Sequence, residues 1–334
     1  MPAKSISNNL LSYHQKALQN GQVDVGMISL QTGWRFKLLS GENLSVVFES
    51  AEARIRLMVR SVSFFAIASY NFYFLVLSFI YIFIFNNHAQ KAKHSMYASK
   101  CALLDSVLLM ELTGRKGDFF SVFDSISSMN DLQDFAKSSK DAHLLQSSYV
   151  FKVLIEYWKG NYQAAEEYSN SASAILPAAK MPTIYLIHHT FFRGLVLFRL
   201  SCQEGNRSRR LEEGKKALAE MEKWSNLSMP VFENKWRLLM ACHATCTQNH
   251  DEALKWYGAS IKLAQEHGLI HELALAFHLQ GDHLHHCGYP SDASESYNQA
   301  YTHYKQWGAH AVADKLLRNM PGNELKFEVE TKVD

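Results

Sequence analysis

The sequence predicts an all-α fold in which helical hairpins stack into an α-solenoid. The first observation is a repeated pair, an alanine followed four residues later by a tyrosine, at Ala164/Tyr168, Ala253/Tyr257 and Ala293/Tyr297. The alanine lets two helices approach closely, and the tyrosine fills the space beside it. The second observation is that no segment alternates strictly enough between apolar and polar residues to predict a strand. A hairpin of this kind cannot bury its own apolar face, so such repeats stack on one another.

The turns between paired helices are the third observation. Gly160 and Gly288 stand where one helix turns into the next, and glycine adopts the positive φ that such a turn needs. Asn249 stands in another of these turns, and asparagine also tolerates positive φ. The spacing from Ala253 to Ala293 is 40 residues, slightly longer than the period of about 34 in tetratricopeptide repeats. We therefore expect a tetratricopeptide-like solenoid with slightly lengthened helices.

Individual helices follow from apolar residues that recur at intervals of three and four. The pattern predicts helices at residues 104–112, 143–158, 183–200, 208–224, 236–246, 251–267, 270–286 and 291–307, and one more that carries Ala164 and Tyr168. Gly114 is expected to end the first of them in the left-handed conformation. The breaks between helices contain Pro177, Pro182 and Pro230, at places where proline is tolerated.

Residues 62–85 form an apolar segment without a charged residue. As a helix it would reach roughly 36 Å, enough to cross a hydrocarbon core of about 30 Å, which predicts a transmembrane helix. Two alternatives are a helix buried in the core of a soluble protein and translated non-coding sequence that is foreign to the mature fold. The predicted domains are an N-terminal helical repeat at 1–60, this apolar insertion at 61–95, a helical-repeat domain at 96–321 and a disordered tail at 322–334.

Composition limits the functional classes. The chain has 34 basic and 32 acidic residues and a formal net charge of +2, which does not predict a nucleic-acid partner. Five cysteines in 334 residues do not suggest a disulfide framework, and no apolar signal segment follows Met1. We therefore expect a cytoplasmic protein in a reducing environment, with membrane association possible only through residues 62–85.

The C-terminal half carries a pattern that resembles a known family. Its residues are Trp224, Pro230, Phe232, Lys235, Ala253, Tyr257, Ile261, Ala264, Gly268, Glu272, Ala274, Ala276, Ala293, Tyr297, Ala300, Tyr304, the run Trp307-Gly308-Ala309 and Pro321. The pattern resembles the helical-repeat region of multi-sensor hybrid signalling kinases, which lies between an AAA-type ATPase module and downstream GAF and histidine-kinase modules. Residues 9–57 look like an earlier repeat of that region. The resemblance implies a helical connector in a signalling protein, although Val312 stands where the family often has lysine.

Signatures of the family's catalytic modules are missing from the sequence. Gly214-Lys215-Lys216 lacks both the leading glycine and the following hydroxyl residue of a phosphate-binding loop. The kinase triplets His-Arg-Asp and Asp-Phe-Gly do not occur. Cys242 with His243, or Ser291 with Asp292 and His285, would need an orienting third group and an oxyanion site to work as nucleophile and base. We therefore expect neither an enzyme nor a cofactor.

Histidine and cysteine residues crowd into two short stretches. These residues are His278, His283, His285, His286 and Cys287 in one stretch, and Cys242 and Cys246 in the other. Both sets could approach a metal ion if the hairpins brought them together. They lie on continuous predicted helices that need no metal for stability, so we interpret them as ordinary surface and inter-helix residues and predict no metal site.

The leading functional hypothesis is a non-catalytic scaffold that binds another protein or peptide. Aromatic side chains on its concave face would be the anchors for that partner, namely Tyr257, Tyr297, Tyr301, Tyr304 and Trp307. The alternative for each of them is packing between repeats. Two other functions stay open: a fragment or remnant of a multi-domain AAA-ATPase/histidine kinase, and a membrane-tethered scaffold anchored by residues 62–85.

Overall fold

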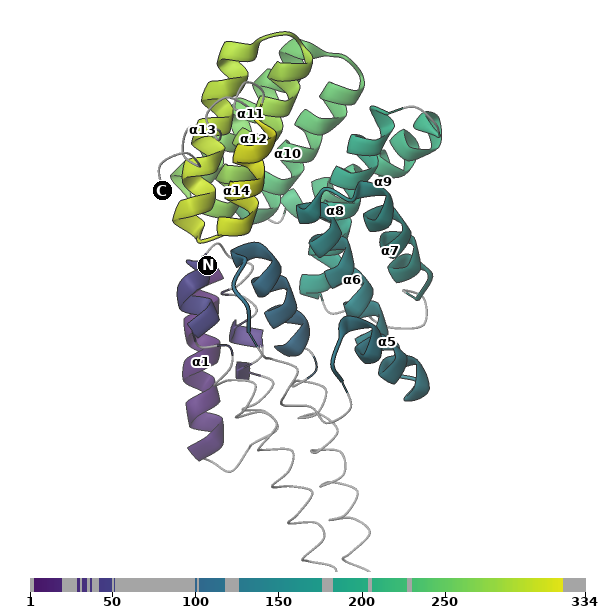
Figure 1. Ribbon diagram of the computed structural model, residues 1–334, viewed down its shortest axis with the longest axis vertical. Coiled ribbons are helices and arrows are strands. Elements are labelled where there is room, and N and C mark those ends of the chain that lie inside the picture. The colour runs from purple at the N-terminus through teal and green to yellow at the C-terminus, as the bar shows by residue number, and fades with distance from the viewer. Residues whose placement is uncertain are drawn as a thin grey trace, which may run out of the picture. The chain divides into compact units, whose positions relative to one another are not determined.

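The computed structural model describes residues 3–19, 29–30, 32–34, 37, 42–49, 51, 100, 102–117, 126–175, 183–203, 206–226 and 230–320. Within these ranges all regular structure is α-helical and no strand occurs, which confirms the predicted all-α class (Figure 1). None of the helices in these ranges is both long and apolar enough to cross a membrane. The apolar segment 62–85, the predicted domain boundaries at 60 and 95 and the predicted tail 322–334 lie outside the described residues.

The chain divides into two compact units. The first contains the described residues up to Met110 and those from Arg115 to Ser148, among them α1 (Ala3–Gln19) and α5 (Met129–Ser138). The second contains Glu111–Gly114 and the described residues from Tyr149 onward. The division therefore passes through α6 (Ala142–Lys159), whose first two turns belong to the first unit.

The second unit is a series of helices, each packed on its neighbours in the chain. They are α7 (Tyr162–Ile175), α8 (Thr183–Ser201), α9 (Arg207–Ser225), α10 (Pro230–Cys246), α11 (His250–Glu266), α12 (Ile270–His286), α13 (Pro290–Trp307) and α14 (His310–Asn319). Helix α10 also contacts α8 and α12, so alternate helices meet as well as consecutive ones (Figure 1). Stacked helical hairpins produce this pattern of contacts.

Glycines in the left-handed region end several of these helices. Gly160 and Gly288 have φ values of 78° and 84°, as predicted, and Gly114 has a φ of 73°. The prediction for Asn249 was wrong by one residue, because Gln248 carries the positive φ of 59°. Asn249 instead caps α11: its side chain accepts a hydrogen bond from the Glu252 amide and donates another to the Glu252 carboxylate. Such a reciprocal cap stabilises the first turn of a helix.

Close helix contacts depend on small residues, although not always the expected ones. Ala253 with Tyr257, and Ala293 with Tyr297, are buried as predicted. On α7 the buried small residues are Ala165, Ser169 and Ala172. The first two lie one position after the expected Ala164 and Tyr168, which are half-buried. The difference arises because the two pairs lie next to each other on the helix, and the sequence pattern does not distinguish which pair faces α8.

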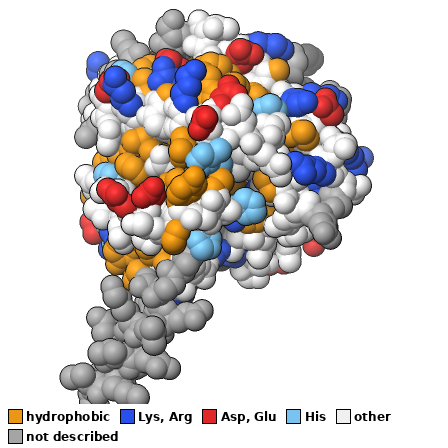
Figure 2. Space-filling view, turned by 90° about the horizontal axis from the view of Figure 1, so that it is seen from above, with side chains coloured by type: hydrophobic (Ala, Val, Ile, Leu, Met, Phe, Trp, Pro, Cys, Tyr) orange, Lys and Arg blue, Asp and Glu red, His pale blue; other side chains and the backbone are white. Residues whose placement is uncertain are grey.

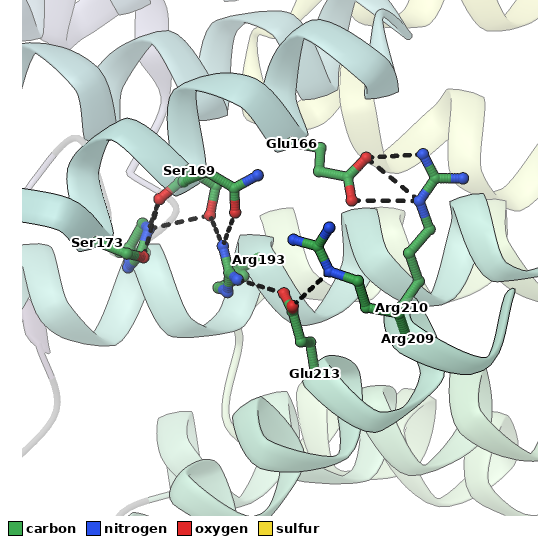
Figure 3. A network of polar contacts seen from close by, with 9 residues as sticks. Glu166, Ser169, Ser173, Arg193, Arg209, Arg210 and Glu213 are labelled. Carbon is green, nitrogen blue, oxygen red and sulfur yellow. Dashed lines mark hydrogen bonds and ion pairs between the residues drawn. The ribbon is translucent and has the colours of Figure 1, made fainter. Parts of the chain in front are cut away.

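Charged side chains join α7, α8 and α9 in one network (Figure 3). Arg210 binds both carboxylate oxygens of Glu166 at 2.8 to 3.2 Å. Arg193 donates to Ser169 at 2.8 Å and to Glu213 at 2.6 Å, and Glu213 also accepts from Arg209. Apart from the more exposed Arg209, these side chains are largely shielded from solvent, so the network stabilises the packing more than exposed ion pairs do.

A second polar network joins α10, α11 and α12 inside the core. Lys235 of α10 forms an ion pair with Glu272 of α12, and both side chains are buried. Asn234 donates to the other Glu272 oxygen at 2.6 Å and accepts from Ser260 of α11 at 3.0 Å. Burying a charge is costly unless it is paired and hydrogen-bonded, and here both conditions hold. Two positions of the family-like pattern, Lys235 and Glu272, therefore have a structural role.

Candidate functional site

A cavity of about 580 Å³ opens in the second unit. Its walls come from the C-terminal ends of α6, α8, α10 and α12 and from parts of α7, α9, α11 and α13. The volume is in the range of pockets that bind small molecules or single side chains. Because successive hairpins each supply part of the wall, the cavity is a product of their stacking.

One wall of the cavity is a charged and aromatic network between α8 and α12. Arg199 forms an ion pair with Asp282 at 2.9 Å and lies 5.5 Å from the ring centre of Tyr162. Tyr297 donates a hydrogen bond to the same Asp282 carboxylate at 2.9 Å. Burial raises the pKa of the Tyr297 hydroxyl, and the Asp282 charge raises it further, so this group stays a hydrogen-bond donor at neutral pH.

Four cysteines line the cavity, and the pKa values of three of them, Cys202, Cys242 and Cys246, are shifted in different directions. The Sγ atoms of Cys202 and Cys246 are 2.9 Å apart. The hydrogen bond from Cys246 lowers the pKa of Cys202 to about 7, with help from the nearby charges of Arg199 and Arg207. The same contact raises the pKa of Cys246, and burial raises that of Cys242 to about 12. Cys202 is therefore the thiol among these three that forms a reactive thiolate near neutral pH.

Imidazole and thiol groups meet at another part of the wall. His283 Nε2 lies 2.9 Å from His250 Nδ1 and 3.8 Å from Cys287 Sγ. The other ring nitrogen of His283 lies 3.2 Å from the Thr245 hydroxyl. Burial lowers the pKa of His283 to about 4, so its ring is neutral at pH 7.

Of the histidines and cysteines considered as metal ligands from the sequence, only His283 and Cys287 lie together in the structure. His283 and Cys287 come together, but with His250 of α11 and not with Cys242 or Cys246. His278 contacts the Tyr304 hydroxyl at 3.2 Å. His285 and His286 are exposed. Sequence reasoning missed His250 because its position depends on how α11 packs on α12, whereas the spacing of four between His283 and Cys287 places both on one helical face.

The residues weighed as nucleophile and base have other surroundings. Cys242 lies in the cavity wall, 3.9 Å from the Tyr257 hydroxyl, while His243 packs against the ring of Phe198. Ser291 and Asp292 are exposed at the start of α13. Cys242 and His243 are therefore placed by packing between helices, and Ser291 and Asp292 are placed in contact with solvent.

Four of the five aromatic residues predicted to bind a partner are buried. Tyr257, Tyr297, Tyr304 and Trp307 are each 5% exposed or less, whereas Tyr301 is half-buried. Tyr257 and Tyr297 also reach the cavity wall. Tyr304 and Trp307 pack edge-on or tilted against Trp158 of α6, with ring centres about 6 Å apart. Burial at this level favours packing between helices for Tyr304 and Trp307, and it leaves Tyr301 as the member of the set with the most accessible side chain.

Comparison of the chain with protein-family models, with curated proteins and with solved structures gave no match in any of the three. The resemblance to the kinase connector therefore remains a prediction from the sequence pattern. On the face drawn in Figure 2, basic and acidic side chains both occur and histidine side chains lie beside hydrophobic ones. Because the three comparisons gave no match, the functional proposal is based on the cavity and the side chains that line it.

Proposed function

We propose that this chain is a non-catalytic, tetratricopeptide-like helical-repeat scaffold that binds a segment of another polypeptide in the cavity between α8, α10 and α12. The single observation that carries the proposal is the cavity itself, because successive hairpins each contribute part of its wall. Helical-repeat proteins use such shared surfaces to bind peptides. On the resemblance described above, a signalling protein is the class of partner that we expect.

The chemistry of the walls supports a peptide with an apolar anchor next to an acidic side chain. Phe198, Leu195 and Tyr162 supply aromatic and aliphatic surface. The charge of Arg199 is balanced by Asp282, whereas no carboxylate among the described residues forms an ion pair with Arg207. Aromatic and arginine side chains provide much of the affinity at peptide-binding sites.

A cavity-filling substitution tests the proposal. Leu279 of α12 lines the cavity and is half-buried, so Leu279→Trp should fill part of the space. Leu254 of α11 is equally half-buried and lies away from the cavity lining, so Leu254→Trp is the matched control. Peptides selected by phage display on the full-length chain should bind the control variant as they bind the natural protein. Their affinity for Leu279→Trp should fall by about tenfold or more, measured by fluorescence anisotropy.

Two results would count against peptide binding in the cavity. One is that selection enriches no peptide above an unrelated immobilised protein. The other is that both tryptophan variants bind the selected peptides equally well. Circular dichroism of the two variants, compared with the natural chain, separates loss of binding from loss of fold.

A further inference from the structure

In the cavity wall one thiol and two imidazoles lie close together, in an arrangement that resembles a metal site. Ligand atoms of His250, His283 and Cys287 all lie within 4.8 Å of one another. In a tetrahedral zinc site, bonds of about 2.0 to 2.3 Å place the donor atoms about 3.3 to 3.8 Å apart. The separation of 3.8 Å between His283 Nε2 and Cys287 Sγ already fits, and the 2.9 Å between His250 and His283 needs only a small opening.

The hydrogen bonds of Thr245 determine which nitrogen of His283 is available to a metal ion. The Thr245 hydroxyl has one proton, and it lies in position to give that proton to the Ala241 carbonyl at 3.0 Å. Thr245 therefore accepts from His283 Nδ1 at 3.2 Å, so that this nitrogen carries the ring proton. His283 Nε2 is left with a lone pair directed at His250 and Cys287. A metal-binding histidine is commonly oriented by such a bond from its second nitrogen.

The positions of the three side chains favour binding of one ion by all three together. His283 and Cys287 are four residues apart at the end of α12, and His250 begins α11, so two rigid helices fix the three donors. The His250 ring is held in turn by stacking on Tyr289, with ring centres 5.4 Å apart. All three residues also line the cavity, which leaves room for a further ligand on that side.

We propose that His250, His283 and Cys287 bind a zinc ion, with the fourth tetrahedral position open to water from the cavity. One thiolate and two imidazoles form a donor set that suits Zn²⁺ and excludes Mg²⁺ and Ca²⁺, which prefer oxygen ligands. Binding releases the Cys287 thiol proton to solvent, whereas each imidazole binds through a nitrogen lone pair and keeps one ring proton on its other nitrogen. The site lies in the wall of the same cavity, but the zinc proposal does not rest on peptide binding there. It differs from the sequence-based expectation of no metal.

Metal titration of the full-length chain, purified without a histidine tag and stripped with a chelator, tests the proposal. We expect about one zinc ion per chain by elemental analysis. Cobalt in place of zinc should give the visible absorption of a tetrahedral site and a thiolate-to-cobalt charge-transfer band. Cys287→Ser and His250→Asn should each lower zinc affinity by about 100-fold or more. Cys287→Ser should also remove the thiolate-to-cobalt band, and His250→Asn should change the cobalt spectrum.

Control variants separate this site from other histidines and thiols. His285→Asn changes an exposed imidazole on the same turn and should leave zinc affinity unchanged. The double variant Cys202→Ser/Cys246→Ser should also keep its zinc, because those thiols belong to a different contact. Thr245→Val removes the orienting hydroxyl and should weaken binding by about 10- to 100-fold.

Three outcomes would overturn the zinc site. They are the absence of bound metal, zinc binding that survives Cys287→Ser, and zinc binding that is lost in the Cys202/Cys246 double variant. His283 is buried, so its substitution is left out of the decisive set. Far-UV circular dichroism of each variant reports whether the helices persist. A variant that keeps its helices but loses zinc supports the assignment.

Discussion

Cys202 differs from the other thiols of the cavity in the group that its sulfur contacts. The Cys246 sulfur, 44 residues away in the chain, lies 2.9 Å from it, and a hydrogen bond from the Cys246 thiol stabilises the Cys202 thiolate. The nearby guanidinium groups of Arg199 and Arg207 also favour the negative charge. Cys242 is buried, and burial disfavours its thiolate and so raises its pKa.

Alkylation should therefore distinguish the two cysteines by pH. We expect the rate of Cys202 modification by iodoacetamide to rise with a midpoint near pH 7, below the value of about 8.5 for an ordinary thiol. Cys242, with its pKa near 12, should stay unmodified over the same range. Peptide mass spectrometry follows each thiol separately. Cys246→Ala removes the hydrogen-bond donor, so it should move the Cys202 midpoint upward; an unchanged midpoint would contradict the assigned cause.

At the scale of the elements, the contact between α12 and α13 depends on one position without a side chain. A Cβ atom at Gly281 of α12 would lie 2.7 Å from two ring carbons of Tyr297 on α13. Real Cβ atoms do not approach other atoms so closely, and the ring is held by its hydrogen bond to Asp282. The helix pair therefore packs as it does because glycine occupies this position.

Gly281→Ala should destabilise the protein. The clash with the Tyr297 ring costs about 1 to 3 kcal/mol. The higher helix propensity of alanine offsets about 1 kcal/mol of that cost. Gly258→Ala is the matched control, because that glycine is also within a helix and no atom lies within 4 Å of an added Cβ. The control should stabilise the protein by about 0.5 to 1 kcal/mol. Urea unfolding followed by circular dichroism measures both; equal effects of the two substitutions would refute the packing argument.

At the scale of the whole molecule, much of the second unit could be predicted, because helix periodicity and turn glycines are local signals. Helix α12 has the predicted bounds, 270–286. Helix α10 begins at Pro230 and not at residue 236, since proline is tolerated in the first turn and does not always mark a break. The cavity could not be predicted, because its contacts join distant residues. The pair Arg199 and Asp282, for example, is separated by 83 positions in the sequence.

The pH dependence of stability is also a property of the whole second unit. Burial lowers the pKa of His189 to about 4 and that of His271 to about 3, compared with about 6.5 in an unfolded chain. Between these values the unfolded state binds protons that the folded state does not. Stability is therefore fully present above about pH 6.5 and is lost as the pH falls toward 4.

We expect the free energy of unfolding to be lower at pH 5 than at pH 7 by about 1 to 2 kcal/mol for each of these histidines. His189 lies 3.1 Å from the Ser169 hydroxyl, and its pKa is lowered further by the charge of Arg193. His189→Gln keeps a polar group beside Ser169 and removes the titration, so it should reduce the difference by one such contribution. Denaturant unfolding at both pH values provides the measurement, and equal differences in the two proteins would contradict the role of His189.

The buried pair of Lys235 and Glu272 has a consequence for the alignment of α10 with α12. Both oxygens of Glu272 are bonded, one to Lys235 and one to Asn234, and Asn234 also holds Ser260 of α11. Sliding α12 along α10 by one helical turn, about 5.4 Å, would leave a carboxylate and an ammonium group unpaired in apolar surroundings. We infer that this interior charge pair selects one register of the stacked helices and thereby holds the cavity wall in a single arrangement.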